Sequence, residues 1–460
     1  MKKTLAIVTI LLITLSTFVV LVPRQAASSS SSWTLKQLTK NDVDDVLSLY
    51  PISRDGKKIV FDRRPPNPLN WDIYEMNVSD EPGQEKQMTV ANGRDIGAKI
   101  SGDGSIIAFE SNRFNPSNPW DLEIFSMNFT DNPGQEIQVT DSSTYLDSDL
   151  AISGGGKIIA WHSGSSSTGP FDILVLNMTD KSLTRIDAGQ WDEYPSVSYD
   201  GRKIAFTEVY SGDVYLVNSD GTGLRQITNT PEREDRWSLI SGDGTKIAFR
   251  RMVCGNYEIF VYDIVDDVFS QLTNNNVDDW LGSINYDGTI VAYDRGGHIY
   301  IHDMTHETQL TDGPYTDECP RLDGDGNTIA FRSRGRDGSD TEIFAMTSPL
   351  SATVDIDPDT LNLKSNGQWI TAYITLPDAC TVEDIVLETV CLDGIPAAWS
   401  EIQDGVYMIK FDRATVQASF TNEPDYDSAP KFYDMTLAIT GNLVDGTPFE
   451  GSDTIRVLSK

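Results

Sequence analysis

A pattern of polar and apolar positions recurs along residues 50–335 of this chain. Each copy begins with a polar, glycine-containing turn, continues with three apolar residues, and adds a second apolar segment that ends in another polar turn. Clear copies are Asp-Gly-Arg-Lys-Ile-Ala-Phe at residues 200–206 and Asp-Gly-Thr-Lys-Ile-Ala-Phe at residues 243–249. The turn glycines are Gly56, Gly104, Gly156, Gly201, Gly244, Gly288 and Gly326, spaced 38 to 52 residues apart. This pattern predicts a series of repeated β-hairpins.

The apolar triplets predict how the hairpins pack. They are residues 59–61, 107–109, 159–161, 204–206, 247–249, 291–293 and 329–331, with alanine in the middle of six of them. An unbroken apolar run is typical of a strand that is covered on both faces, and a lone four-stranded sheet cannot provide that cover. Sheets stacked around an axis can, and the repeat length is that of a propeller blade. The sequence therefore predicts an all-β fold with a seven-bladed β-propeller.

A second motif, Gln-x-Thr, closes most of the repeats. It occurs at residues 87–89, 138–140, 226–228, 271–273 and 309–311, and Leu183-Thr184 is interpreted as a weak third copy. The last repeat lacks the motif after Met346, but Gln37-Leu38-Thr39 stands before the first repeat. We expect this N-terminal segment to pair as the outer strand of the last blade and to close the ring, which removes its open edges.

These motifs together carry a resemblance to a known family. The Ser-x-Asp-Gly-x-x-Ile-Ala-Phe, Glu-Ile-Phe and Gln-Leu-Thr set resembles the TolB-type, WD-repeat-like β-propeller over residues 33–347. The resemblance implies a scaffold that binds other proteins outside the cytoplasm through its channel and one loop face. It names no reaction, because the same ring serves binders, inhibitors and enzymes.

The repeat stops after residue 347. Residues 352–460 contain short alternating runs such as Trp369–Ile374 and Met435–Ile439, which are typical of a β-sandwich. The opening Ile-Asp-Pro-Asp-Thr-Leu and the closing Gly-Ser-Asp-Thr-Ile-Arg-Val resemble a small Ig-like module of archaeal and bacterial surface proteins. That resemblance implies a spacer or an anchor.

The N-terminal 32 residues predict export. Lys2 and Lys3 precede an apolar stretch from Leu5 to Val22, and five serines at residues 28–32 form a linker to the propeller. The apolar stretch lies between the usual length of a cleaved signal peptide and that of a membrane anchor, so both remain open. Either one places the propeller outside the cytoplasm, secreted or attached to the membrane.

Charge narrows the class of partner. The chain has a formal net charge of −33, from 69 acidic and 36 basic side chains. Nucleic acid is an unsuitable partner, because phosphates are neutralised by clustered Lys and Arg. A protein or peptide of the cell envelope is compatible with this charge.

A series of carboxylates provides the candidate ligand site. Nine residues before the turn glycines stand Asp95, Asp147, Asp192, Asp235, Asp279 and Asp317, with Asp45 as a displaced counterpart in the first repeat. We expect each at the start of the innermost strand, at one mouth of the channel. Two interpretations stay open. The carboxylates bind a ligand or a divalent cation, or they have a structural role: they hold the loop between blades through backbone amides or pair with arginines of the next loop, namely Arg64, Arg113, Arg251, Arg295 and Arg334.

The long loops on the same face are the predicted partner contacts, since loops commonly carry binding residues. The candidates are Arg63, Arg64 and Trp71 in the first repeat and Arg113 and Trp120 in the second. For Trp71 and Trp120, packing at a strand start is the alternative interpretation.

Two kinds of covalent modification are open. Asn77, Asn128 and Asn177 begin glycosylation sequons in equivalent turns, although the turn chemistry of the repeat generates the same pattern. Cys380 and Cys391 are candidates for a disulfide, and four free thiols are the alternative.

The usual catalytic and metal motifs are not found. His298, His302 and His306 lie too far apart on a strand to hold one ion and are interpreted as surface residues. Residues 355–366 lack the glycine and glutamate of a calcium loop, and no Gly-x-Ser-x-Gly elbow follows the propeller. We therefore expect no metal and no cofactor, apart from the channel-mouth cation considered above.

The sequence favours an exported or membrane-tethered protein-binding scaffold rather than an enzyme. The first alternative is an extracytoplasmic lyase or hydrolase with a metal or carboxylate site at the channel mouth. The second alternative is a structural component of the cell surface.

Overall fold

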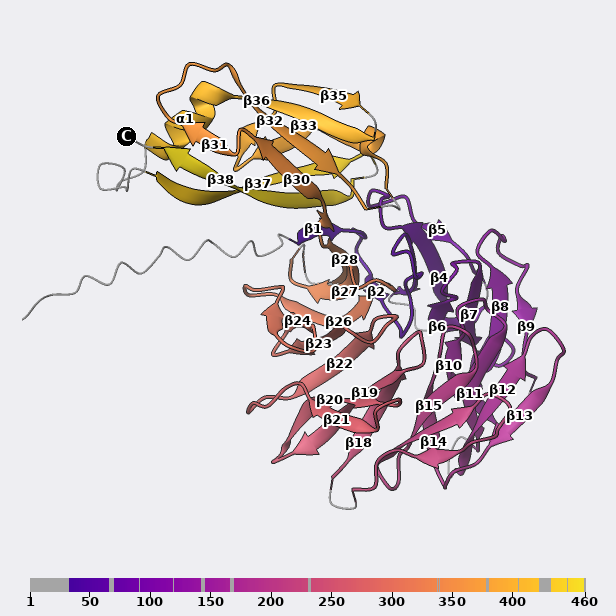
Figure 1. The fold of residues 1–460 in the computed structure, drawn as a ribbon. Helices are drawn as coiled ribbons and strands as arrows, with labels where there is room; N and C mark the ends of the chain where they lie inside the picture. Colours follow the sequence, from indigo (N-terminus) through magenta and orange to yellow (C-terminus); the bar gives the residue numbers. More distant parts are fainter. Residues whose placement is uncertain are drawn as a thin grey trace, which may run out of the picture.

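The structure is a computed structural model, and it describes residues 33–458 except 66–69, 91, 119, 142–144, 166–168, 231–232, 337, 339, 378–379, 404, 422–431 and 445. The predicted leader, residues 1–32, lies outside the described residues. Figure 1 shows a rounded body built from residues 34–347, followed in the chain by a smaller lobe. The described residues contain no helix that is both long and apolar enough to cross a membrane.

Residues 44–347 form repeated antiparallel units of up to four strands, each named here after its first strand. The strands are β2 (Asp44–Val46), β3 (Lys58–Arg64), β4 (Asn70–Asn77) and β5 (Lys86–Gln87); β6 (Gly93–Ile100), β7 (Ile106–Ser111), β8 (Glu123–Asn128) and β9 (Ile137–Gln138); β10 (Leu146–Ile152), β11 (Ile158–Gly164), β12 (Phe171–Asn177) and β13 (Leu183–Ile186); β14 (Asp192–Val197), β15 (Lys203–Glu208), β16 (Asp213–Asn218) and β17 (Arg225–Gln226); β18 (Asp235–Ile240), β19 (Lys246–Val253), β20 (Asn256–Asp263) and β21 (Val268–Gln271); β22 (Asp279–Ile284), β23 (Val291–Arg295), β24 (His298–His302) and β25 (Glu307–Gln309); β26 (Thr316–Leu322), β27 (Thr328–Arg334) and β28 (Thr341–Thr347). A short parallel contact between β4 and β6 joins the β2 and β6 units into one sheet.

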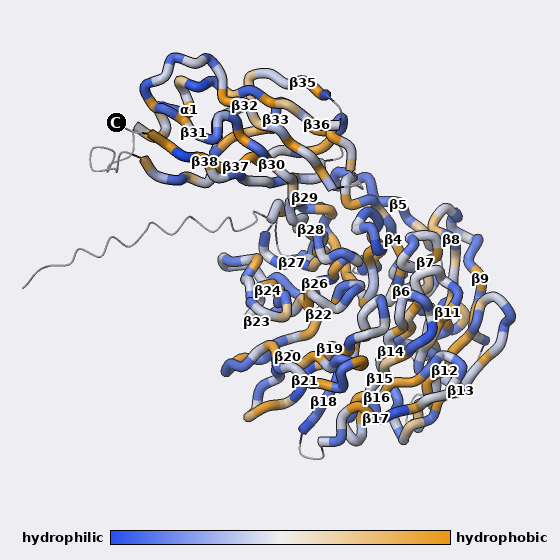
Figure 2. Tube along the Cα trace, in the orientation of Figure 1, coloured by the Kyte–Doolittle hydropathy of each residue, from blue (hydrophilic) through white to orange (hydrophobic). Residues whose placement is uncertain are grey.

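The predicted apolar triplets form the second strands of these units and are buried. Ile59, Val60 and Phe61 of β3 are fully buried, and so are Ile247, Ala248 and Phe249 of β19. Their side chains alternate between two hydrophobic clusters, so each sheet is covered on both faces by its neighbours. Figure 2 shows the matching colours, with hydrophobic segments in the strands and hydrophilic segments in the turns.

The N-terminal strand β1 (Thr34–Gln37) pairs antiparallel with β28, as the sequence predicts. Leu38 follows it and is fully buried among residues of the β2 and β26 units. The Thr39 hydroxyl donates to Glu342, and the N–H of Asn41 donates to the same carboxylate at 2.7 Å. Residues about 300 positions apart in the chain are thereby held together at this edge of the β26 unit.

Glu342 makes the stability of this contact depend on pH. Burial raises the pKa of Glu342 from its ordinary value of 4.5 to about 7, although the hydrogen bonds from Thr39 and Asn41 oppose the change. Between these values the folded protein holds a proton that the unfolded chain releases. The free energy of unfolding therefore falls as the pH rises from 4.5 to 7, with a slope of at most about 1.4 kcal/mol per pH unit.

We expect Glu342→Gln to remove this contribution, which urea unfolding at pH 5 and pH 7.5 measures. The difference in the free energy of unfolding between the wild-type protein and the variant should change by about 1–3 kcal/mol between the two pH values. The change should favour the variant at the higher pH. A gap that stays constant would show that Glu342 is ionised in the folded protein throughout.

One predicted motif copy is displaced. In the other units the glutamine of Gln-x-Thr lies opposite an aromatic residue of the third strand, as in Tyr74 with Gln87 and Phe260 with Gln271. In the β10 unit the residue opposite the equivalent Leu174 is Arg185. The third copy is therefore Arg185-Ile186-Asp187 and not Leu183-Thr184, because the hairpin between β12 and β13 is three residues longer than the sequence assignment implied.

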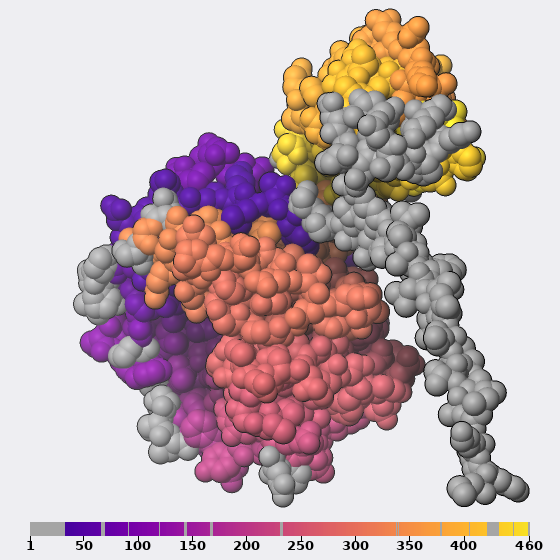
Figure 3. Space-filling view, turned by 90° about the vertical axis from the view of Figure 1, so that its left-hand side faces the viewer, coloured from indigo at the N-terminus to yellow at the C-terminus, as the bar shows by residue number. Residues whose placement is uncertain are grey.

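The C-terminal lobe contains two sheets that share one hydrophobic cluster. One sheet holds β29 (Leu350–Ser351), β38 (Pro448–Leu458), β37 (Phe432–Leu443), β33 (Ile385–Leu392), β34 (Ile395–Pro396) and β31 (Thr360–Asn362), and the other holds β30 (Thr353–Asp357), β32 (Trp369–Thr375), β36 (Val406–Asp412) and β35 (Trp399–Gln403). A 3-10 turn, η1 (Val382–Asp384), and one α-helix, α1 (Arg413–Thr421), complete it. Buried residues of both sheets, such as Ile409 and Ile439, meet in the cluster, so the predicted alternating runs do form strands of a two-layer structure. Figure 3 shows this lobe standing beside the larger body.

Candidate functional site

A pocket lies where the first strand of every unit turns into the second. It is lined by residues of each such turn, including Arg54, Gly102, Gly154, Tyr199, Gly242, Tyr286 and Gly324. Backbone hydrogen bonds of 2.7–2.9 Å link successive turns, from 54 to 102, 103 to 154, 154 to 199, 199 to 242, 243 to 286, 286 to 324, and from 324 back to 54. The turns thus form an unbroken hydrogen-bonded circle around the pocket.

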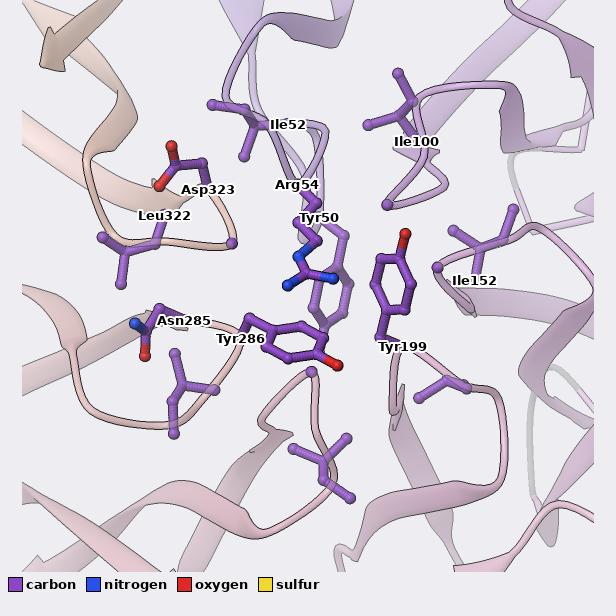
Figure 4. A pocket seen from close by; sticks show the side chains of 17 residues that line it. Tyr50, Ile52, Arg54, Ile100, Ile152, Tyr199, Asn285, Tyr286, Leu322 and Asp323 are labelled. Atoms are coloured by element: carbon purple, nitrogen blue, oxygen red, sulfur yellow. The ribbon is translucent and has the colours of Figure 1, made fainter. Parts of the chain in front are cut away.

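Side chains of the protein itself point into this pocket (Figure 4). The Arg54 guanidinium lies over the Tyr286 ring at 3.7 Å and near the Tyr199 ring at 5.0 Å, and Figure 4 shows the three side chains meeting at its centre. The neighbouring glycines make room for them: a Cβ atom at Gly154 would lie 2.3 Å from the Tyr199 ring. A cation–π stack therefore lies across the centre of this pocket and narrows it.

The predicted carboxylates stand at the opposite end of the first strands. Each of Asp45, Asp95, Asp147, Asp192, Asp235, Asp279 and Asp317 is the first, second or third residue of its strand, as expected, and is at most 3% exposed. Asp45 has the same position as the others, so it is a true counterpart. The seven side chains belong to seven separate first strands and do not gather into one site.

Most of these carboxylates bind an arginine of their own unit. Asp235 accepts two hydrogen bonds from Arg251, at 2.6 and 2.7 Å, and Asp279 pairs in the same way with Arg295. Arg113 binds Asp95 at 2.9 Å. The predicted partners Arg64 and Arg334 were wrong: Arg63 binds Asp45 and Arg336 binds Asp317. Arg63 lies directly opposite Asp45 in the β2–β3 ladder, whereas Arg64 turns toward Asp62.

Asp147 and Asp192 differ from this pattern. Asp147 accepts a hydrogen bond from the Trp161 indole at 3.1 Å. Asp192 accepts the N–H of Ala188 at 2.7 Å, and the residue opposite it in the ladder is Glu208. Burial raises the pKa of Asp192 to about 7; the Ala188 hydrogen bond opposes this, and the carboxylates of Glu208, Asp187 and Asp172 add to it. In the β14 unit, a glutamate therefore stands opposite the buried aspartate, where other units have an arginine.

A second set of ionisable groups lies deeper in the body, and sequence reasoning missed it. Glu110 accepts the N–H of Leu150 from the next unit, and burial together with the charge of Asp149 raises the pKa of Glu110 to about 8. Burial lowers the pKa of Lys99. Burial and Asp149 also raise the pKa of Glu193 to about 7. With pKa values near neutral, Glu110 and Glu193 have the property that general acid–base chemistry requires.

Two histidines are also buried. His162 lies 2.7 Å from the Ser148 hydroxyl through Nε2 and 3.4 Å from Asp149 through Nδ1, and burial lowers its pKa. His302 is only 8% exposed, so interpreting the histidines of residues 298–306 as surface residues was wrong for His302. It lies on β24, where alternate side chains face the neighbouring sheet.

The predicted partner residues divide into two groups. Arg63 and Arg113 bind the buried carboxylates described above, while Arg64 lies over the Trp71 ring at 4.6 Å. These four side chains therefore have contacts within the chain. Trp120, in contrast, is 65% exposed.

The modification candidates have turn or packing roles. The side-chain amides of Asn77 and Asn128 donate to Asp80 and Asp131 at 3.0 Å, and the Asn177 oxygen accepts the N–H of Thr179. These are contacts of the repeat's own turns. Whether glycans are attached stays a prediction.

The proposed disulfide between Cys380 and Cys391 is not formed in the structure, where both thiols are free. Cys380 packs against the core of the lobe. Cys391 lies between the core-facing Val390 and Leu392 of β33 and therefore points to the other face of the sheet.

Comparison with known proteins gives one related sequence and several similar folds. No model of a known protein family matches the chain. A protein TolB homolog of Chlorobium luteolum is 31% identical over 163 residues, which is 35% of this chain and 35% of that protein. The chain thus matches about a third of the length of its curated relative.

Two solved structures share the fold of the larger body. An oligogalacturonate lyase in complex with manganese has a TM-score of 0.56 at 16% identity, over 70% of this chain and 94% of that chain. The oligogalacturonate lyase of Vibrio parahaemolyticus has a TM-score of 0.56 at 15% identity, over 70% of this chain and 95% of that chain. At these identities the likeness concerns the fold alone.

Proposed function

Starting from a TolB-type β-propeller as the fold of the larger body, we propose that the chain is an exported scaffold that binds a protein or peptide of the cell envelope. In this proposal the propeller has seven blades and is closed by β1, and the C-terminal lobe is an Ig-like spacer. The pairing of β1 with β28 and the hydrogen-bonded circle that returns to Arg54 support closure. The apolar stretch and serine linker of residues 1–32 support export.

Contacts within the chain engage the charged groups at both ends of the ring. The Arg54 stack crosses the pocket at one end, and five of the seven predicted carboxylates at the other end are bound by arginines. These contacts support the outer loops as the partner surface.

One observation carries the proposal: exposed aromatic side chains share one face. Loops from second to third strands, and the starts of first strands, lie at the same end of each unit because neighbouring strands are antiparallel. On this end the exposed aromatic residues are Phe114 (69%), Trp120 (65%), Tyr145 (53%), Tyr210 (75%) and Trp280 (44%). Exposed aromatics with polar surroundings are typical of protein-binding surfaces. We call these five residues the aromatic face.

The test is capture of partners from an envelope extract by purified protein, with each captured protein quantified. We expect the double variant Phe114→Ala/Trp120→Ala to retain at least tenfold less of the specific partner, since buried aromatics are the commonest hot spots. Val265→Ala is the matched control, because Val265 is 74% exposed in a turn at the opposite end of its unit. Equal capture by all three proteins would contradict the proposal.

An enzyme is the second candidate function. The buried carboxyl groups of Glu110 and Glu193, whose pKa values lie near neutral, favour it. The similar folds are named oligogalacturonate lyases, and removal of a proton by a general base is a chemistry that Glu110 or Glu193 could support. Incubation of the protein with oligogalacturonate and Mn²⁺ tests it. Product formation that is lost in Glu193→Gln would favour the enzyme. If no product forms at any pH between 5 and 9, the binding scaffold stays the proposed function.

A further inference from the structure

Three carboxylates meet where the β10 and β14 units adjoin. Asp172 begins the third strand of the β10 unit, Asp187 follows its fourth strand, and Asp192 begins the β14 unit. One oxygen of each lies within 4.8 Å of the others. Asp172 and Asp192 are buried, whereas Asp187 is exposed, so the group opens to solvent on one side. We call these residues the acidic site.

Comparison between repeats shows that this site arises from two exchanges of residue type. Asp187 occupies the position of the threonine in Gln-x-Thr, because Arg185 aligns with the glutamine. In the other units this threonine accepts a strand N–H, as Thr89 and Thr273 do. The β10 unit therefore has a negative charge where the others have a hydroxyl.

The second exchange removes a positive charge. In the β2, β18 and β22 units, the residue opposite the buried aspartate in the ladder is an arginine: Arg63, Arg251 and Arg295. In the β14 unit it is Glu208. Glu208 is occupied by the N–H groups of Trp191, Tyr210 and Ser211, so it adds charge without being available as a ligand.

One carboxylate oxygen of Asp192 lacks a hydrogen-bond partner among the described residues. Its Oδ2 accepts the Ala188 N–H at 2.7 Å, but its Oδ1 is buried and has no hydrogen-bond partner among the described residues. A buried carboxylate oxygen without a partner is costly. Arg185 binds Asp172 at 2.6 Å with its own side chain 62% exposed, and it is the one cation that ion-pairs with the site within the described part of the chain.

We infer that the acidic site binds a calcium ion, which takes the place of the guanidinium that binds the equivalent aspartate in five other units. Carboxylate oxygens are the ligands that hard divalent cations prefer. Three oxygens within 4.8 Å of one another can reach one such ion. Ca²⁺ accepts the irregular geometry of a site assembled from three separate segments, whereas Mg²⁺ demands a near-ideal octahedron. Water completes the coordination from the exposed side, at Asp187.

The experiment uses residues 33–460 after removal of metal by a chelator. Isothermal titration with CaCl₂ should give one site per chain, and Ca²⁺ should raise the melting temperature by a few degrees. Asp187→Thr, which restores the residue of the other repeats, and Asp192→Asn should each weaken Ca²⁺ binding at least tenfold. Asp220→Asn, at an exposed turn carboxylate, is the matched control and should bind as the wild type does.

Three results would overturn the inference. They are no saturable Ca²⁺ binding by the wild-type protein, binding that persists unchanged in both site variants, and Mg²⁺ binding of equal strength. Circular dichroism of Asp187→Thr establishes that the variant is folded. The titration of the wild-type protein decides the matter even if Asp192→Asn does not fold.

Discussion

Leu38→Ala is expected to lower the free energy of unfolding by about 2–5 kcal/mol. The Leu38 side chain is fully buried between the β2 and β26 units, in a cluster with Ile59, Ala330 and Ile343. Its truncation leaves a cavity at the point where β1 joins the ring. Urea unfolding of residues 33–460, followed by tryptophan fluorescence, measures the change.

Leu35→Ala is the matched control for this prediction. Leu35 lies three residues earlier, within β1, but is 42% exposed. It should cost no more than about 0.5 kcal/mol. Equal effects of the two substitutions would mean that β1 contributes only backbone pairing and that Leu38 does not hold the ring closed.

Arg251→Met is expected to destabilise the protein by about 3–5 kcal/mol, because it leaves the Asp235 carboxylate buried without its cation. Asp235 is fully buried, and two hydrogen bonds of 2.6 and 2.7 Å join it to Arg251. The double variant Asp235→Leu/Arg251→Met should recover part of that loss, since it removes both charges. Thermal and urea unfolding of the three proteins provide the comparison.

Arg202→Met serves as the control, as Arg202 is 85% exposed and lies 3.6 Å from the exposed Asp200. A surface pair of this kind is worth at most about 1 kcal/mol. The same experiment separates the two interpretations of the carboxylates. If Asp235 served chiefly to bind a ligand, Arg251→Met would leave stability nearly unchanged and would alter binding instead.

The repeated unit was predictable because its causes are local. An Asp-Gly turn followed by three apolar residues specifies a hairpin and its buried strand, and the missing Gln-x-Thr of the last repeat pointed to β1. The positions of the aspartates in the first strands followed from the same period. Their partners did not: the register of each ladder decides that Arg63, and not Arg64, faces Asp45.

The buried ionisable groups of the interior, such as Glu110 and Lys99, could not be predicted from the repeat length of the sequence. Irregularities of the backbone determine their positions. The first strands contain register shifts, and Asp149 and Tyr194 have φ values of 51° and 56° there. The side chains of such residues do not follow the strict alternation between the two faces of a strand, on which prediction from the sequence depends. The charges of Glu110 and Lys99 interact across such a register shift, so no regular sequence spacing relates the two residues.

The stack of Arg54, Tyr199 and Tyr286 had a signal in the sequence that was not used. Aligned on their turn glycines, four repeats have glycine two residues before it, whereas three have Arg54, Tyr199 and Tyr286. Large side chains in a minority of copies indicate a shared space that only some of them can fill. The same alignment shows Glu208 as an exception, whereas Asp187 was located only by the register of the β12–β13 ladder.

Under the proposed export from the N-terminus, the pairing of β1 with β28 sets an order of events. Thr34–Gln37 emerges first, yet its partner Thr341–Thr347 emerges some 300 residues later. Until then the earliest segment has to remain unpaired, and the ring stays an open, adhesive stack of sheets. Assistance during translocation, by a chaperone that shields the waiting strand, would therefore matter more for this protein than for one whose sheets close locally.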